Sequence, residues 1–283
     1  MKSVIINLCD VLEVGDDMKK QLILLAVLSV ALTGCLKPTT PSIGTALMPA
    51  PIMHRSSPDS SAQELSVAVS GFYGHTDDAY NLENLNAFGG NIGLTYRMAG
   101  TLSPFFLNVA AGVFGGSLHF GCDASHRCSR EDEYDKDYIT WLDSKQGRKS
   151  YSFWNMQERI LIGADFSPAF FILGSAIGFQ LYEGVSSDYD HMRRRLDNEG
   201  LMESRGHDNG ADVTTSVWFG SYFGRNGRFG NLVAEFDMIF KHEYEDAVGS
   251  IKWTYTHPSG FFGGFARGDL IDFSLFVGKQ FVF

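Results

Sequence analysis

The stretch that decides the fold runs from Phe229 to Glu243 and reads FGNLVAEFDMIFKHE. Its even-numbered positions are mostly apolar, and its odd-numbered positions include Asn231, Glu235, Asp237, Lys241 and Glu243. Alternation with a period of two predicts a β-strand with one apolar face and one polar face. Soluble strands usually have about five or six residues, whereas tilted membrane strands need roughly 9–11. The length of this stretch therefore favours a membrane strand.

The same alternation recurs along the rest of the chain and predicts an all-β domain over residues 64–283. Ten candidate strands are separated by connections that alternate between short and long, as in membrane barrels. The candidate strands are 65–73, 87–98, 104–118, 150–165, 169–182, 211–223, 229–243, 248–257, 261–267 and 270–283. We expect an antiparallel up-and-down transmembrane β-barrel with ten strands. Eight strands, with 247–268 as an external excursion, and a soluble periplasmic β domain tethered by lipid are the alternatives.

Composition limits the classes of function. The chain has 283 residues, of which 44% are hydrophobic and 20% charged, and its net charge is −10. That charge argues against a nucleic-acid partner, because binding phosphates needs a basic surface. The mean hydropathy of −0.07 excludes a bundle of membrane helices but allows alternating barrel strands.

The N-terminal region reads as a targeting segment. Lys19 and Lys20 precede an apolar run, Gln21 to Ala31, that is too short to span a membrane as a helix. Residues 18–34 are therefore expected to be a signal peptide beginning at Met18. Residues 1–17 carry four acidic side chains, unlike a signal peptide, and we interpret them as a misassigned extension.

The end of this segment, Leu32-Thr33-Gly34-Cys35, resembles the lipobox of bacterial lipoproteins. The resemblance implies cleavage before Cys35 and acylation of its thiol, for example with palmitate. It also implies handling by the lipoprotein-sorting machinery. Leu36 stands where Asp would suggest retention in the inner membrane, so the resemblance implies the outer membrane of a Gram-negative bacterium.

Residues 35–63 are rich in Pro, Ser and Thr, and we expect them to form a flexible, disordered linker after the lipidated cysteine. Further along, Cys122 and Cys128 lie six positions apart in a polar loop. In an exported protein such a pair favours a disulfide, and a metal site with His119 and His126 or two free thiols are the alternatives.

The last strand ends at Phe283 and resembles the C-terminal signature of bacterial outer-membrane barrels. The resemblance implies recognition by the barrel-insertion machinery, with outer-membrane lipid as the surrounding partner. An even number of strands puts the N- and C-termini on the periplasmic side.

Charged residues of the polar rows are expected to face a narrow lumen. Opposite charges should pair there, because an unpaired buried charge is expensive. The expected members of this lumen charge network are Arg97, Arg159, Glu235, Asp237, Lys241, Lys252 and Asp272. An internal network that fills the lumen is the favoured interpretation, and a small polar conduit is the alternative.

Function should then reside in the external loops. We expect a structural or surface-interaction role, with acidic, disulfide-stapled loops displayed outside the cell, and no cofactor beyond the lipid. Weak catalytic candidates at the rim are His75, Asp77, His207 and Asp208, because Asp and His together can activate a water as in omptin-type surface proteases. A rim hydrolase and a small-solute channel or binder are therefore alternatives. No pattern identifies an external ligand.

Overall fold

The structure is a computed structural model, and it describes much of the chain after Pro38. The described residues are 40–41, 50–55, 62–78, 83–100, 104–120, 140–141, 144–167, 170–185, 188–201, 204–205, 209–240, 247–269 and 271–283. By internal contacts, residues 1–37 form one unit and residues 38–283 a second. The second unit contains every described residue.

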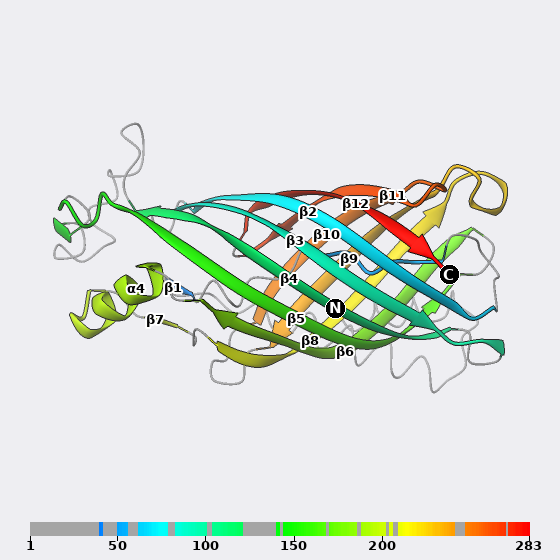
Figure 1. Cartoon of the computed structure of the whole chain (residues 1–283), viewed down its shortest axis with the longest axis horizontal. Coiled ribbons are helices and arrows are strands. Elements are labelled where there is room, and N and C mark those ends of the chain that lie inside the picture. Colours follow the sequence, from blue (N-terminus) through cyan, green and yellow to red (C-terminus); the bar gives the residue numbers. More distant parts are fainter. Residues whose placement is uncertain are drawn as a thin grey trace, which may run out of the picture. The chain divides into compact units, whose positions relative to one another are not determined.

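A closed antiparallel β-barrel of ten strands forms the body of this unit (Figure 1). Its strands are β2 (Glu64–Asp78), β3 (Glu83–Arg97), β4 (Phe105–Phe120), β5 (Ser150–Phe166), β6 (Phe171–Gly184), β8 (Asn209–Tyr222), β9 (Asn231–Phe240), β10 (Ala247–Thr256), β11 (Phe261–Gly268) and β12 (Phe273–Val282). The prediction of ten strands is confirmed. The eight-strand alternative is wrong, because residues 261–268 pair with β10 on one side and with β12 on the other.

The barrel closes where β12 pairs with β2, with Phe273 opposite His75 and Val282 opposite Ser66. Every other neighbouring pair follows the order of the chain, so the topology is up-and-down. The two ends of the barrel differ. We call the end with residues 98–104, 167–170, 223–230 and 257–260 the turn end, and the end with residues 121–149 and 185–208 the loop end.

Burial in the barrel is inverted relative to a soluble protein. Along β5, exposed and buried positions alternate for most of the strand. The exposed side chains include Trp154, Ile160 and Ile162, whereas Asn155 and Arg159 are buried. The apolar rows of the sequence therefore face outward, and the polar rows face the lumen. This arrangement contradicts the soluble β domain, which would bury its apolar rows.

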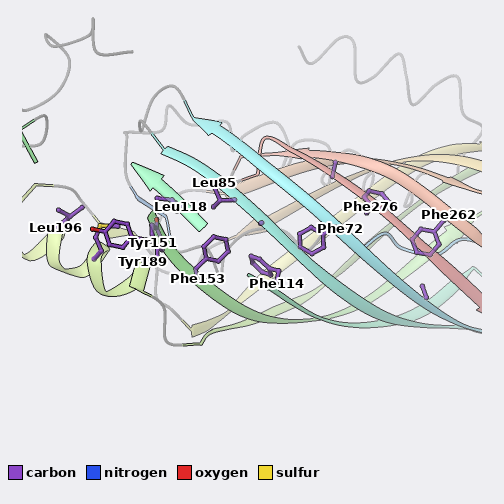
Figure 2. Packing of buried hydrophobic residues seen from close by; sticks show 14 of the residues in the cluster. Phe72, Leu85, Phe114, Leu118, Tyr151, Phe153, Tyr189, Leu196, Phe262 and Phe276 are labelled. Atoms are coloured by element: carbon purple, nitrogen blue, oxygen red, sulfur yellow. The ribbon is translucent and has the colours of Figure 1, made fainter. Parts of the chain in front are cut away.

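An α-helix packs against barrel side chains at the loop end. Helix α4 (Asp188–Asn198) begins with two acidic residues, which suit the positive end of a helix dipole. The helix buries Tyr189, Met192 and Leu196 in a cluster with Tyr151 and side chains that continue down into the barrel (Figure 2). The exposed Arg195 donates a hydrogen bond to Glu199 at 2.7 Å, which raises the pKa of its guanidinium. Among the described residues, no helix is long and apolar enough to cross a membrane.

Two short strands lie beside this helix. β7 (Ser204–Arg205) follows α4 in the chain, and it pairs in parallel with β1 (Thr40–Pro41) (Figure 1). The start of β2 and the end of β12 lie together at the turn end, where the Leu65 amide donates to the Phe283 carbonyl. β2 thus begins, and β12 ends, at the turn end. β1 lies beside the connection between α4 and β8 at the loop end.

The prediction of a flexible linker over 35–63 is wrong for residues 50–55. Ala50, Ile52, Met53, His54 and Arg55 are all at most 6% exposed, and they are enclosed by the barrel. The physical reason is that their backbone and side chains supply partners for charged groups of the lumen. Several predicted features lie outside the described residues: the signal peptide, Cys35, Cys122, Cys128, His207 and Asp208.

Candidate functional site: a lumen filled by the chain's own segment

Residues Ala50–Arg55, which we call the plug, occupy the lumen without regular secondary structure. Lumen side chains bind its backbone at successive positions. The Ala50 carbonyl accepts hydrogen bonds from Arg159 at 2.9 Å and from Lys252 at 3.2 Å. The Ile52 amide donates to Glu235 Oε2 at 3.1 Å. A chain without regular structure thereby finds partners for several of its buried backbone groups, as burial demands.

Four charged residues in the middle of the barrel form what we call the central cluster: Arg159, Glu235, Asp237 and Lys252. They come from β5, β9 and β10, and each is at most 1% exposed. Lys252 Nζ lies 2.7 Å from Asp237 and 3.0 Å from Glu235, and Arg159 lies 3.9 Å from Asp237. Two positive and two negative side chains thus offset each other, which lowers the cost of burying them.

A second group, which we call the turn-end cluster, consists of His54, Arg97 and Asp165. Asp165 Oδ2 lies 3.0 Å from both His54 Nδ1 and Arg97 Nη1. Because a carboxylate only accepts hydrogen bonds, His54 Nδ1 is the donor in the first contact. Arg97 also donates to the Met53 carbonyl, so the cluster holds the plug through backbone and side chain alike.

The plug ends at the rim of the turn end. The Arg55 carbonyl accepts a hydrogen bond from the Tyr222 hydroxyl at 2.9 Å. The Arg55 guanidinium donates to the carbonyls of Ala62 at 2.8 Å and Met98 at 3.3 Å. Arg55 therefore ties the plug to the last residue of β8 and to the residue after the end of β3.

Apolar side chains pack around the plug. Ile52 packs in a cluster with Phe106, Leu161, Ile172 and Trp218, among others. Met53 belongs to the other cluster, which also holds Phe72, Phe114 and Phe276 (Figure 2). Side chains alone fill barrels of about eight strands. Ten strands leave a wider lumen, and here the plug occupies part of it.

The outer surface carries a second pattern, which the sequence analysis did not identify. Exposed aromatic side chains gather at the turn end: Phe105, Phe166, Phe170, Phe171, Phe223, Phe229, Phe261, Phe281 and Phe283. A second row lies toward the loop end: Tyr73, Phe88, Trp154, Phe265 and Phe273. Between the two rows the exposed side chains include Ile92, Val109, Ile160, Ile177 and Val277. In the strand registers the second row follows β11, β12, β2, β3 and β5, with Tyr73 directly opposite Phe88.

The structure brings most of the expected lumen residues into these two clusters. Arg159, Glu235, Asp237 and Lys252 lie together in the central cluster, whereas Arg97 lies apart from them in the turn-end cluster. Asp272 lies at the loop end, just before β12, where its amide donates to Thr76 Oγ1 at 3.0 Å. Lys241 lies outside the described residues.

The structure describes only part of the predicted rim site. His75 is half-buried on β2, and its Nδ1 lies 3.1 Å from Asn86 Oδ1. The backbone of Asp77 continues β2, but its side chain is not among the described ones. Across the part of the chain that the structure describes, no group of three His, Cys, Asp or Glu side chains is arranged to hold a metal ion.

Sequence reasoning missed Asp165, His54, Trp218 and Tyr222 as lumen partners. Asp165 lies on the polar row of its strand, so alternation alone identified its direction but not its role. The signal for the plug was the short stretch Ala50-Pro51-Ile52-Met53-His54-Arg55 within a segment otherwise rich in Ser, Thr and Pro. Three apolar residues and two basic ones are unusual in a solvated linker.

These features define a closed β-barrel with an apolar outer surface and a charged lumen that its own chain occupies. No protein-family model matches the chain, and no curated protein matches it. Solved structures with a similar arrangement include an outer-membrane channel from Pseudomonas putida F1, with 8% identity, a TM-score of 0.38, and coverage of 82% of this chain and 100% of that one.

Two further similar structures are the translocator domain of the autotransporter NalP from Neisseria meningitidis and OprB from Pseudomonas putida. The first has 7% identity, a TM-score of 0.38, and coverage of 79% of this chain and 89% of that one. The second has 7% identity, a TM-score of 0.28, and coverage of 79% and 93%. Similarities of this size carry no functional argument, so the function has to be inferred from the lumen and the outer surface themselves.

Proposed function

We propose that this protein is an outer-membrane β-barrel, lipid-anchored through Cys35, whose lumen is closed by its own plug and whose loop end serves surface interactions. The observation that carries the proposal is the inverted polarity of the barrel. Ile162 is 63% exposed and Val277 66%, whereas Arg97 and Lys252 are 0% exposed. An apolar outer surface is unfavourable in water and favourable in lipid, because the transfer of apolar area from water to lipid lowers the free energy.

The two aromatic rows support a membrane setting independently. Membrane barrels carry girdles of aromatic residues at both interfaces, with an apolar band of about 25 Å between them. Here Phe88 and Trp154 form an edge-to-face pair with centroids 5.8 Å apart, and Phe265 stacks with Phe273 at 6.3 Å. Outer-membrane lipid is accordingly the proposed surrounding partner, and the insertion and lipoprotein-sorting machinery are the proposed assembly partners.

The lumen supports a structural role rather than an open channel. The plug binds both clusters, and apolar side chains pack around it. An ion crossing the barrel would have to displace the plug and separate buried ion pairs, which is costly. The resting protein is therefore a closed barrel, and interactions with the outside belong to α4 and the long connections. We place the acidic segment around Glu131 and a Cys122–Cys128 disulfide among those connections.

Two measurements test the proposal. Unboiled samples from the outer-membrane fraction should migrate faster on a denaturing gel than boiled samples, because a closed barrel resists the detergent. A Cys35→Ser variant should lose its acyl chains by mass spectrometry. Recovery of the wild-type chain in the soluble periplasmic fraction, with no shift on boiling, would contradict the proposal.

Conductance in planar lipid bilayers tests the closed lumen. The wild-type barrel should give no stable ion conductance. Replacing residues 50–55 by alternating Gly and Ser should produce discrete openings, because the His54–Asp165 contact, the guanidinium bonds of Arg55 and the packing of Ile52 and Met53 are lost. The same replacement at residues 56–61 is the matched control and should leave the barrel closed. Equal conductance from wild type and plug variant would show that the plug does not close the lumen.

A further inference from the structure

The position of β1 fixes where the chain stands before it reaches the plug. Thr40 and Pro41 pair with Ser204 and Arg205. Those two residues lie between α4 and the first residue of β8, Asn209, within the connection at the loop end. At Pro41 the chain is therefore at the loop end of the barrel.

The plug fixes where the chain goes next. Ala50 binds Arg159 and Lys252 in the middle of the lumen. Arg55 then binds the Met98 carbonyl and the Tyr222 hydroxyl at the turn end, from where the chain continues into β2. From Ala50 to Arg55 the chain thus runs from the centre of the barrel toward the turn end.

Covalent geometry allows one continuous path between these points. Arg159 lies nine positions into β5 from Ser150 at the loop end. In a strand tilted by about 40° that is a depth of roughly 23 Å along the barrel axis. The nine peptide units from Pro41 to Ala50 span at most about 30 Å when extended. The chain is long enough to descend from the loop end to the central cluster.

We infer that the chain passes through the barrel from the loop end to the turn end, so that everything before Thr40 leaves the barrel at the loop end. The inference rests on the proposed outer-membrane location and lipidation. The two termini then lie on opposite sides of the membrane, with Phe283 at the periplasmic turn end, and not both on the periplasmic side as expected from the strand count. Cys35 is five peptide units before Thr40, at most about 18 Å of chain, so its lipid enters the outer leaflet.

The closed wall of the barrel limits how a segment of the chain can reach the lumen. β12 pairs with β2 along ten residues, and every strand of the barrel has hydrogen-bonded neighbours on both sides. A segment bound inside cannot enter sideways once that pairing is complete. The strands therefore assemble around the segment, and assembly carries the N-terminal part of the chain to the cell surface. The inferred function is to display a lipidated N-terminus at the cell surface beside α4, and the chain reaches that position through the barrel lumen.

Thiol labelling on intact cells tests the inference. Single cysteines are placed at Thr39→Cys, ahead of β1, at Asn198→Cys, exposed on α4, and at Arg225→Cys, exposed at the turn end. The full chain carries Cys122→Ser and Cys128→Ser, and this background without an added cysteine gives the baseline. A maleimide that cannot cross membranes is applied before and after the outer membrane is permeabilised, and the gel shift on boiling verifies folding of each variant.

The expected result is that Thr39→Cys behaves like Asn198→Cys and is labelled on intact cells, whereas Arg225→Cys is labelled only after permeabilisation. If Thr39→Cys, like Arg225→Cys, is labelled only after permeabilisation, the inference is overturned, whereas the proposed outer-membrane barrel remains in place. Release of all three variants in the soluble periplasmic fraction would overturn the proposed function and the inference with it.

Discussion

Lys252 Nζ lies 2.7 Å from Asp237 Oδ2, and both side chains are withdrawn from solvent in the middle of the barrel. The same ammonium group reaches Glu235 at 3.0 Å and the Ala50 carbonyl at 3.2 Å. One side chain thus joins the wall of the barrel to the plug. Its removal should affect both.

We expect Lys252→Met to destabilise the folded barrel by about 3–5 kcal/mol, because two buried carboxylates then share Arg159 alone. The measurement is a urea titration in lipid vesicles that follows the folded band on a gel. Lys149→Met is the matched control, since Lys149 is 57% exposed and its pair with Asp188 is 3.6 Å long. It should change the free energy of unfolding by less than about 1 kcal/mol. Equal effects of the two variants would contradict the central role of Lys252.

Asp165→Asn should destabilise the turn end by about 3 kcal/mol, because it leaves the buried guanidinium of Arg97 without its close carboxylate. The next carboxylate, Glu64, is 3.8 Å from Arg97. Amide hydrogen exchange should also speed up at residues 53–55, which this cluster holds. Asp188→Asn, at an exposed ion pair, is the control. Unchanged exchange at 53–55 would show that the plug does not depend on Asp165.

The outward face is tested by Ile160→Arg. Ile160 is 42% exposed and pairs with Val109 and Phe179, both exposed and apolar. Near the middle of a bilayer an arginine on the lipid face costs about 2–4 kcal/mol. Folding into vesicles should therefore fall, whereas Asn198→Arg on α4 should be neutral. If Ile160→Arg folds as well as wild type and gains solubility, the face does not contact lipid.

Gly178 tests how closely the strands approach at the lumen wall. A Cβ at this position would clash with the Ile160 carbonyl oxygen, which belongs to the backbone and has little freedom to move. Gly178→Ala should cost about 2 kcal/mol or more. Gly93→Ala is the matched lumen-facing control, because its Cβ would meet Ala110 at an ordinary 3.9 Å. The urea titration used for Lys252 compares the two, and equal stability would refute the close approach.

Alternation was enough to predict the strands and the face on which most side chains lie, and the connection lengths favoured ten strands over eight. Arg97, Arg159 and Glu235 were assigned to the lumen because they lie on the polar rows of alternating strands, and each is buried there. Alternation does not report depth along the barrel. Arg97 therefore could not be separated from the central cluster, and Asp272 could not be recognised as a loop-end residue.

The plug escaped prediction for a different reason. Its contacts join residues far apart in sequence, such as Ile52 with Glu235 and His54 with Asp165. No local periodicity encodes them, because each plug residue takes its own partner from the wall. Proline and serine on both sides made the segment resemble a tether, and only the barrel around it shows why six residues become ordered.

The plug is joined to β2 by a short connection, residues 56–63, and this has a consequence for any molecule that would occupy the lumen. A ligand on a short tether experiences an effective concentration on the order of millimolar. A soluble competitor of equal intrinsic affinity must reach that concentration before it displaces the plug from Glu235 or Asp165. The barrel therefore discriminates against free solutes by intramolecular competition, whatever their chemistry.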